Sequence, residues 1–423
     1  NYEKKQECYL ISESKNNLEL VGEGEKNKIY LKQNPSLIFI KSILSILLFL
    51  SFLFVLNNMY KFKIREKFEF LYPVSLIFWL IIFSMTNVEN INFLNSYFYQ
   101  YPGGDGYWYL FTANLIAENL KQFNLFEAFR GGRDVFYFMP GMRYFVGIEK
   151  FIYGNSYYLH LIILSFLPFV LRKLLEIYLP KKLVLLLIFS FLLFPLMHHM
   201  GFSYFQFVRY STKVWAEPIS YTIFFYGLVR LIYFYKEKEF YYNSLPFTCL
   251  LLTISCIMRP NLASSSFFLL LFPFIYLIFH RKFSIFFLFS ISGFVIFLPM
   301  LHNIYYGQSF VLFTAAVFTD ANIKINIEDY FTLITTLNLI DEKKIMLIEM
   351  LKNFFNPFEF HKYFILLGLI FSFNLKNFKN KILIPLYILI FSQFYLFLFI
   401  NPAPRYIWIF WIISLILSIH SFI

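Results

Sequence analysis

Cysteine is scarce in this sequence. The chain of 423 residues contains three cysteines, Cys8, Cys249 and Cys256, and the last two lie within one apolar run. A disulfide framework needs an even set of cysteines, and a cysteine metal cluster needs closely spaced pairs. Neither is indicated, and redox chemistry at cysteine is not expected.

Charged residues are also few. They make up 15% of the chain, whereas 59% of the residues are hydrophobic and 23% are aromatic. In a soluble domain roughly half of the residues are apolar. This composition excludes an ordinary soluble domain and predicts an integral membrane protein. The net charge is +12, but the basic residues are dispersed in short clusters between apolar runs, with no basic stripe beside an aromatic platform. We therefore expect no nucleic-acid partner.

The beginning of the chain lacks the features of a secretion signal. The chain starts at Asn1 without Met, and no basic segment leads into an apolar run with a small-residue cleavage site. Residues 1–36 are polar and balanced in charge, which is typical of a loop or tail. We expect a truncated polar tail, followed by one membrane bundle over residues 37–423, since no internal repeat or linker divides that part.

Apolar runs dominate the rest of the chain. A helix needs about 20 apolar residues to cross a bilayer, and fewer where neighbouring helices thin the membrane. The pattern predicts an all-α integral membrane protein with about eleven transmembrane helices. Their approximate ranges are 37–57, 71–87, 157–178, 183–199, 217–235, 244–260, 262–279, 283–301, 363–375, 382–400 and 405–421.

The loops between these runs alternate in charge. Five short loops are rich in Lys and Arg, which is typical of the cytoplasmic side of a membrane. The opposite loops are longer and mixed in charge, and the two largest are residues 88–156 and 302–362. We expect a multi-pass protein of the bacterial inner (cytoplasmic) membrane, surrounded by membrane lipids, with these large loops facing the periplasm or exterior.

The first large outer loop carries the charges and glycines that the apolar runs lack. After Asp105, apolar residues recur at helical spacing and predict an amphipathic helix lying on the membrane, with Trp108, Phe111 and Leu115 on one face. Pro140 suits the first position of a second such helix, because its fixed φ is already helical. A further pair of surface helices is expected from Glu328 to Phe355.

Asp105 is the candidate catalytic base. It stands among Gly103, Gly104 and Gly106, which leave the carboxylate open to another molecule. A carboxylate so placed can accept the proton of an attacking hydroxyl. The alternative is a structural role, in which Asp105 caps a helix that starts at Tyr107. The two roles are compatible, and Tyr107 is itself a candidate contact for the substrate.

Asp134 is the candidate second catalytic acid. It ends the segment RGGRD, and Arg143 follows nearby. Opposite charges at this density are typical of a salt-bridged loop, in which a surface pair contributes about 0–1 kcal/mol. The functional alternative is a polar pocket in which Asp134 assists Asp105 while Arg133 or Arg143 binds a phosphate or a sugar hydroxyl. A divalent metal shared by the two aspartates stays open, because hard cations bind carboxylate oxygens.

Three more charged residues lie at the outer ends of predicted spans. Glu217 begins one span, Arg259 ends the next, and Arg405 begins the last. Each alone is typical of an anchor at the membrane interface, but together with the two aspartates they predict a substrate-binding site. Arginine binds phosphate bidentately, so Arg405 is the first candidate for contact with a lipid-linked phosphate.

Several of these motifs resemble the polytopic GT-C glycosyltransferases. The resemblance begins with the outer loop, where Asp105 stands two residues before Tyr107 and an amphipathic helix follows. It continues in short segments, which are DVFYFMPGMRY with Gly154 behind it, WAEP, RPN, HNIYYGQSFVLFT and the pair Arg405-Tyr406. It covers most of the chain from about Leu71. It specifies the superfamily, which includes mannosyltransferases and aminoarabinose transferases, more than one subfamily.

The resemblance implies a transferase with an outward-facing carboxylate base and a donor sugar carried on polyprenyl or dolichyl phosphate. By position, Asp105 corresponds to the base and Arg405 to a residue that binds the phosphate. Several family members have an acidic pair at this site, whereas Gly106 follows Asp105 here. This departure makes Asp134 the better candidate for a second carboxylate. The predicted span at 37–57 also lies outside the usual early topology.

Topology favours the same class of donor. Nucleotide sugars are made in the cytoplasm, so an outward-facing transferase needs a donor already carried across the membrane on a lipid. We expect an inverting enzyme that moves one sugar from a polyprenyl-phosphate donor to a lipid or glycan acceptor, in assembly of a cell-envelope glycan. Two alternatives stay open: a polymerase or ligase for whole lipid-linked glycans, and a non-enzymatic transporter or flippase. Transporters place functional charges near the bilayer midplane, whereas these gather at one interface.

Overall fold

The chain divides into two units, Asn1–Arg65 and Glu66–Ile423, which are described separately. The structure is a computed structural model. It describes residues 11–14, 17–20, 27–29, 39, 43, 71–86, 104–154, 158–195, 197–236, 242–315, 360–373, 380–399 and 404–423.

The first unit contains a small antiparallel sheet within the segment that the sequence predicted to be a loop or tail. Its strands are β1 (Ile11–Ser14), β2 (Asn17–Leu20) and β3 (Asn27–Ile29), in the order β1-β2-β3. The register sets Ile11 opposite Leu20 and Leu18 opposite Ile29, so apolar positions pair across both ladders. The prediction missed these strands because each is only three or four residues long. The predicted span at 37–57 lies outside the described residues, except for two helical positions.

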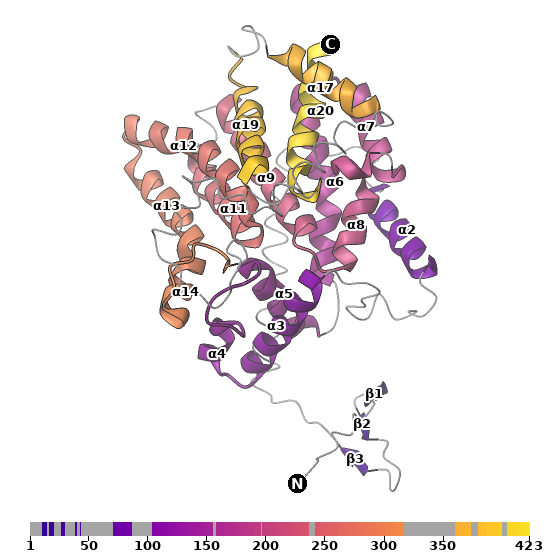
Figure 1. Cartoon of the computed structure of the whole chain (residues 1–423), viewed down its shortest axis with the longest axis vertical. Coiled ribbons are helices and arrows are strands. Elements are labelled where there is room, and N and C mark those ends of the chain that lie inside the picture. Colours follow the sequence, from indigo (N-terminus) through magenta and orange to yellow (C-terminus); the bar gives the residue numbers. More distant parts are fainter. Residues whose placement is uncertain are drawn as a thin grey trace. The chain divides into compact units, whose positions relative to one another are not determined.

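The described residues of the second unit are helical, with no strand among them. Most helices coincide with predicted apolar runs (Figure 1). They are α2 (Leu71–Thr86), α6 (Tyr158–Tyr178), α7 (Lys181–Leu193), α8 (Tyr204–Thr212), α9 (Glu217–Lys236), α11 (Leu245–Met258), α12 (Ala263–Phe279), α13 (Phe283–Phe294), α14 (Leu298–Gly307), α17 (Phe360–Ser372), α19 (Ile384–Phe399) and α20 (Trp408–Phe422). Short 3₁₀ turns connect some of them: η1 (His198–Met200), η2 (Tyr242–Ser244), η3 (Pro260–Leu262), η4 (Val295–Phe297) and η6 (Pro404–Ile407).

Membrane character is confirmed for part of this bundle. Within the described residues, three helical segments are long and apolar enough to cross a bilayer: Pro260–Phe279, Phe283–Gly307 and Arg405–Phe422. Shorter apolar helices cover Leu71–Ile82, Tyr242–Met258, His361–Ser372 and Ile384–Gln393. Three of the described segments are therefore candidate membrane spans by length and composition.

Some predicted boundaries need correction. The run at 183–199 is helical only to Leu193, and the run at 283–301 continues through η4 into α14 and ends at Gly307. The breaks at the two prolines are confirmed. Pro180 separates α6 from α7, and Arg259 before Pro260 is extended, with φ −143° and ψ 92°. Proline disfavours helical backbone in the residue before it, which ends α11 at this point.

Three helices lie in the segment that was predicted to be the first outer loop: α3 (Gly104–Lys121), α4 (Leu125–Arg130) and α5 (Pro140–Tyr153). The predicted helix start at Pro140 is confirmed. Helices α3 and α5 pack closely because Gly147 has no side chain; a Cβ there would lie 2.8 Å from Cγ2 of Ile116. Trp108 and Phe111, predicted on one apolar face of α3, are exposed, whereas the packed face contains Tyr109, Leu110, Ala113, Ile116 and Ala117.

Helix α9 is the core of the bundle. It contacts α6, α8 and α11, and most of its residues are buried, including Tyr221, Phe224, Phe225 and Phe234. Gly227 allows α11 to approach, since a Cβ at this position would lie 3.0 Å from Leu252. The first residue of this rigid helix is Glu217, and the candidate site is built around it.

Candidate functional site

Four charged side chains meet where four elements begin or end. Asp105 lies in the first turn of α3, Glu217 begins α9, Arg259 follows the last residue of α11, and Arg405 lies in η6 just before α20. Because α3 and α9 present their N-terminal ends here, their backbone dipoles favour negative charge at this place. The sequence analysis selected all four residues, and the structure brings them together.

The four charges form a connected chain of ion pairs. Arg405 Nη2 lies 3.1 Å from Asp105 Oδ2, and its Nε lies 3.3 Å from Glu217 Oε1. The same Glu217 oxygen lies 2.8 Å from Arg259 Nη2. Glu217 therefore holds two arginines, and each arginine has a carboxylate partner.

Exposure divides this cluster into a closed part and an open part. The Glu217 and Arg259 side chains are 1% and 2% exposed, whereas those of Asp105 and Arg405 are 23% and 19% exposed. Removing one member of a buried ion pair leaves an uncompensated charge in a low-dielectric region, which is strongly unfavourable. The buried Glu217–Arg259 pair therefore supports the site from below. The partly exposed Asp105–Arg405 pair is the part that an incoming molecule can reach.

The position of Arg405 is fixed through the backbone of η6. Tyr221 donates its hydroxyl hydrogen bond to the carbonyl of Arg405 at 2.9 Å, and Asn261 donates to the carbonyl of Tyr406 at 3.4 Å. Gly201 has a left-handed φ of 71°, and a Cβ there would overlap the buried Trp408 indole. Only glycine therefore lets η1 approach the start of α20 this closely.

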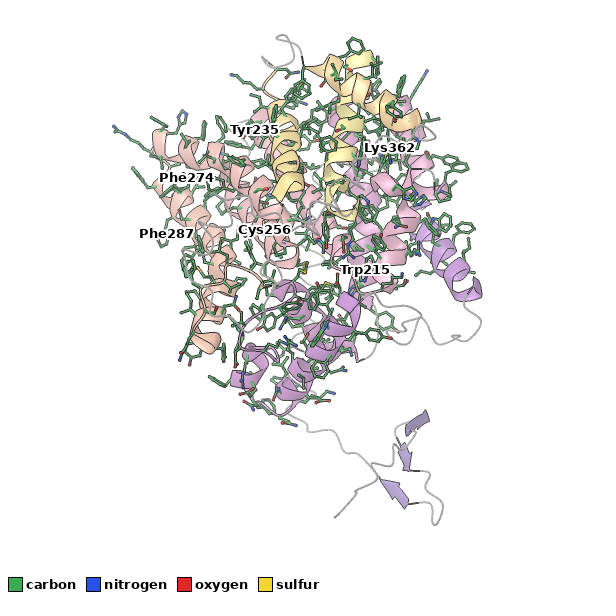
Figure 2. The ribbon with its side chains drawn as sticks, in the orientation of Figure 1. Trp215, Tyr235, Cys256, Phe274, Phe287 and Lys362 are labelled. Carbon is green, nitrogen blue, oxygen red and sulfur yellow. The ribbon has the colours of Figure 1, made fainter. Side chains whose placement is uncertain are left out.

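Aromatic rings enclose both arginines. The Arg405 guanidinium carbon lies 4.3 Å from the ring centroid of Trp215 and 5.1 Å from that of Tyr406, whose hydroxyl also accepts a hydrogen bond from Arg405. Arg259 lies 4.5 Å from the Tyr406 ring. Trp215, labelled in Figure 2, belongs to the segment between α8 and α9. These cation–π contacts lower the cost of holding two guanidinium groups in one partly dry site.

Tyr109 forms the buried wall behind Asp105. Burial, and then the negative charge of Asp105, raise the pKa of the Tyr109 hydroxyl well above its ordinary value. The hydroxyl contacts the sulfur of Met139 and stays neutral at physiological pH. It is not a base for this site.

Asp105 does not cap a helix that starts at Tyr107. Helix α3 already begins at Gly104, so Asp105 is inside its first turn, and its carboxylate binds Arg405. Tyr107 follows two residues later, about half a turn along α3, and is 58% exposed. The structural alternative considered for Asp105 was therefore wrong in its geometry, while the open carboxylate is as expected.

The structure does not bring Asp134 to this cluster. Its carboxylate accepts a hydrogen bond from Arg130 Nε at 2.5 Å in a pair that is 39% and 47% exposed. This is the salt-bridged surface loop that the sequence analysis offered as the alternative. Arg133 lies above the Trp108 ring, 4.4 Å from its centroid.

Arg143 has a structural position. Its side chain is buried and donates to the carbonyls of Gly131 and Phe138, at 3.1 and 3.3 Å. Burial lowers the pKa of Arg143 to about 10. It holds the loop between α4 and α5 in place and does not join the ion-pair chain described above.

Asn303 connects the start of the predicted second outer loop to the predicted first one. Its side-chain oxygen accepts from the backbone N–H of Phe136 at 2.9 Å, and its nitrogen donates to the carbonyl of Val311 at 2.9 Å. The N–H of Ala315 also donates to the carbonyl of Phe136 at 2.7 Å. The expected surface helices from Glu328 to Phe355 lie outside the described residues.

Sequence reasoning missed the aromatic part of the site. Trp215 and Tyr406 stand within the quoted motifs WAEP and Arg405-Tyr406, yet no role was assigned to them. Their closeness to a charged residue in the sequence was the available signal. Among the described residues, no group of three or more His, Cys, Asp or Glu side chains is arranged to hold a metal.

No protein-family model, curated protein or solved structure matches this chain. The functional argument therefore rests on the residues and their geometry.

Proposed function

We propose that this chain is a GT-C-like glycosyltransferase of a bacterial inner membrane. It moves one sugar, joined through phosphate to a polyprenyl lipid, to a lipid or glycan acceptor at the outer face. The contact between Asp105 and Arg405, at 3.1 Å, carries this proposal. The Asp105 carboxylate is a suitable base, and the Arg405 guanidinium is suited to bind a phosphate. Both are partly exposed, so substrates have access to them.

The reaction begins with an exchange of partners at Arg405. The donor phosphate binds the guanidinium group and displaces the Asp105 carboxylate, which then accepts the proton of the acceptor hydroxyl. The hydroxyl oxygen bonds to the anomeric carbon while the bond from that carbon to the phosphate oxygen breaks. The electron pair leaves with the phosphate. A single displacement of this kind inverts the anomeric carbon.

Charge stabilisation comes from groups that are already in position. Arg405 neutralises the charge that develops on the departing phosphate, and the nearby N-terminal ends of α3 and α9 add favourable dipoles. Glu217 and Arg259 touch no reacting atom in this scheme. They are positioning residues that keep Arg405 directed at the open side of the site.

The topology proposed with this function has the candidate site at the outer face. The helical bundle makes about eleven crossings, short basic loops lie in the cytoplasm, and α3 and α5 lie at the outer interface. Lipid-linked substrates then reach the open Asp105–Arg405 pair from the membrane, and the acceptor reaches it from the periplasm or exterior.

The test is a transfer assay with purified full-length protein in lipid nanodiscs. A monosaccharide-lipid and an oligosaccharide-lipid donor are supplied separately, with a pool of glycan and lipid acceptors. We expect transfer from the monosaccharide-lipid and a loss of at least about 100-fold with Asp105→Asn. Asp134→Asn is the matched control and should keep wild-type activity.

Two results contradict the proposal. Full transfer by Asp105→Asn shows that Asp105 is not the base. Turnover with the oligosaccharide-lipid alone identifies a glycan ligase or polymerase.

A further inference from the structure

Trp215 has a second cation beside it. Lys213 Nζ lies 5.4 Å from the ring centroid of Trp215, and the Arg405 guanidinium lies 4.3 Å from the same centroid. The ring is held by Tyr210, whose centroid is 4.3 Å away and whose ring stacks on Trp408 at 5.2 Å. The Trp215 ring therefore contacts both Lys213 and Arg405, and we call the packed rings of Tyr210, Trp215 and Trp408 the aromatic platform.

Lys213 differs from Arg405 in its charge environment. Arg405 has Asp105 and Glu217 as partners, whereas Lys213 forms no ion pair with a carboxylate of the described residues. Burial and the positive charge of Arg209 lower the pKa of Lys213. Arg209 lies four residues earlier on α8, a spacing that puts both side chains on one face. Lys213 and Arg209 therefore add positive charge beside the four-residue ion-pair chain, whose two carboxylates and two arginines already balance.

The Trp215 indole also lacks an acceptor. Its Nε1 atom is buried and has no hydrogen-bond partner among the described residues. A buried N–H without an acceptor is costly, and a phosphate oxygen is a suitable acceptor. This donor lies in the ring shared by both cations.

We propose that Lys213, Arg209 and the indole N–H of Trp215 bind the second phosphate of a diphosphate-linked lipid donor. This inference rests on the proposed function. Arg405 then binds the phosphate next to the sugar, and the leaving group is the polyprenyl diphosphate. The bond between the anomeric carbon and the proximal phosphate oxygen breaks, and Asp105 takes the acceptor proton. A monophosphate diester carries one negative charge and leaves these cations uncompensated, whereas a diphosphate diester carries two.

A competition measurement tests the assignment without any sugar. The full-length protein in phosphatidylcholine nanodiscs is titrated with polyprenyl monophosphate and polyprenyl diphosphate, and Trp fluorescence reports binding. We expect the diphosphate to bind at least about tenfold more tightly, which corresponds to about 1.4 kcal/mol, because its second phosphate adds charge-assisted hydrogen bonds. Lys213→Ala and Arg209→Ala should each reduce this ratio, while Lys213→Arg retains it. Lys236→Ala, at the opposite end of α9, is the control and should change nothing.

The ratio of the two affinities does not depend on folding defects, because partial unfolding weakens the binding of both lipids equally. Equal binding of the two lipids by the wild type, or an unchanged ratio in Lys213→Ala, overturns the proposal. Two further probes separate the source of the phosphate: inorganic phosphate and nanodiscs that contain phosphatidylglycerol. If either competes as well as polyprenyl diphosphate and loses affinity with Lys213→Ala, the subsite binds phosphate in general and the donor assignment is wrong.

Failure of this inference differs from failure of the proposed function. Sugar transfer from a monophosphate donor without any preference for diphosphate supports the function and removes the subsite. A Lys213-dependent preference in a protein that transfers no sugar supports the subsite and removes the function.

Discussion

Asp105 and Arg405 lie 300 residues apart in the chain, and their side chains form an ion pair at 3.1 Å. The pair joins the first turn of α3 to η6, which precedes α20. Because both side chains are partly exposed, such a pair contributes only about 0–1 kcal/mol to stability. Its value to the protein is therefore sought in binding and catalysis.

This reasoning predicts that Asp105→Asn separates activity from stability. Arg405 keeps Glu217 as a partner in this variant, so we expect the free energy of unfolding to fall by less than about 1 kcal/mol. Sugar transfer should fall by at least about 100-fold. Thermal unfolding in detergent and the transfer rate are the two measurements. A large loss of stability would make the pair a structural clamp and contradict the catalytic role.

Glu217→Gln, unlike Asp105→Asn, should lower the stability of the protein strongly. It leaves the buried Arg259 without a charge partner, and we expect a loss of about 3–5 kcal/mol in unfolding free energy. Adding Arg259→Gln to the same chain removes the uncompensated charge and should recover part of that loss. Thermal unfolding of both single variants and the double variant checks this. Additive losses in the double variant would show that the two residues do not act as a pair.

Gly141 sets the distance between α5 and α11. A Cβ at this position would lie 2.8 Å from the backbone nitrogen of Met258, next to Arg259. We expect Gly141→Ala to cost about 1–3 kcal/mol in stability and to reduce sugar transfer, because α5 carries α3 and Asp105 away from the arginines. Gly293→Ala is the control, since its Cβ has an ordinary contact of 3.6 Å with Cys249. Equal effects of both substitutions would argue against this docking role.

Lys150 predicts a pH dependence of stability. It is 8% exposed and donates to the side chain of Asn114. Burial, and then the charge of Lys121, lower the pKa of Lys150 from 10.5 to about 8. Between these two values the unfolded chain binds a proton that the folded chain has released, so stability should rise with pH from about 8 towards 10.5. Below this window both states are protonated and the lysine contributes no slope.

The measurement is thermal unfolding by Trp fluorescence at several pH values between 7 and 10. Lys150→Met should lose the rise that this lysine contributes, and Lys121→Met, which removes only the second cause of the lowered pKa, should keep a smaller rise. A rise of equal size in Lys150→Met would assign it to other groups.

Much of the helical architecture follows from the apolar runs. Pro180 and Pro260 interrupt these runs, and helix boundaries occur beside both because of local backbone restriction. Glu217, Arg259 and Arg405 could be selected because each lies at an end of an apolar run and the predicted topology puts all three on the same side as Asp105. The three short strands were missed because their apolar alternation is brief.

The remaining errors in predicting the site arose because closeness in the sequence did not indicate closeness in the folded chain. Asp134 is nearer to Asp105 in sequence than the other selected carboxylate, Glu217, but Gly131 and Gly132, at φ 63° and 79°, turn the chain so that Asp134 meets Arg130. Trp215 and Lys213 were not selected because aromatic residues make up 23% of the chain and lysines are frequent in its loops. Only the contact of the Trp215 ring with both Arg405 and Lys213 in the folded chain gives them a role.

The shared Glu217 carboxylate also governs the order in which the site can form during synthesis. Arg259 follows Glu217 on the next helix and can neutralise it as soon as α11 has inserted, which allows the half-built bundle to bury the acid. Arg405 is translated after every other member of the cluster. Under the proposed function, a nascent chain that already contains Asp105 lacks the residue that binds phosphate, and sugar transfer waits until the last helix is in place.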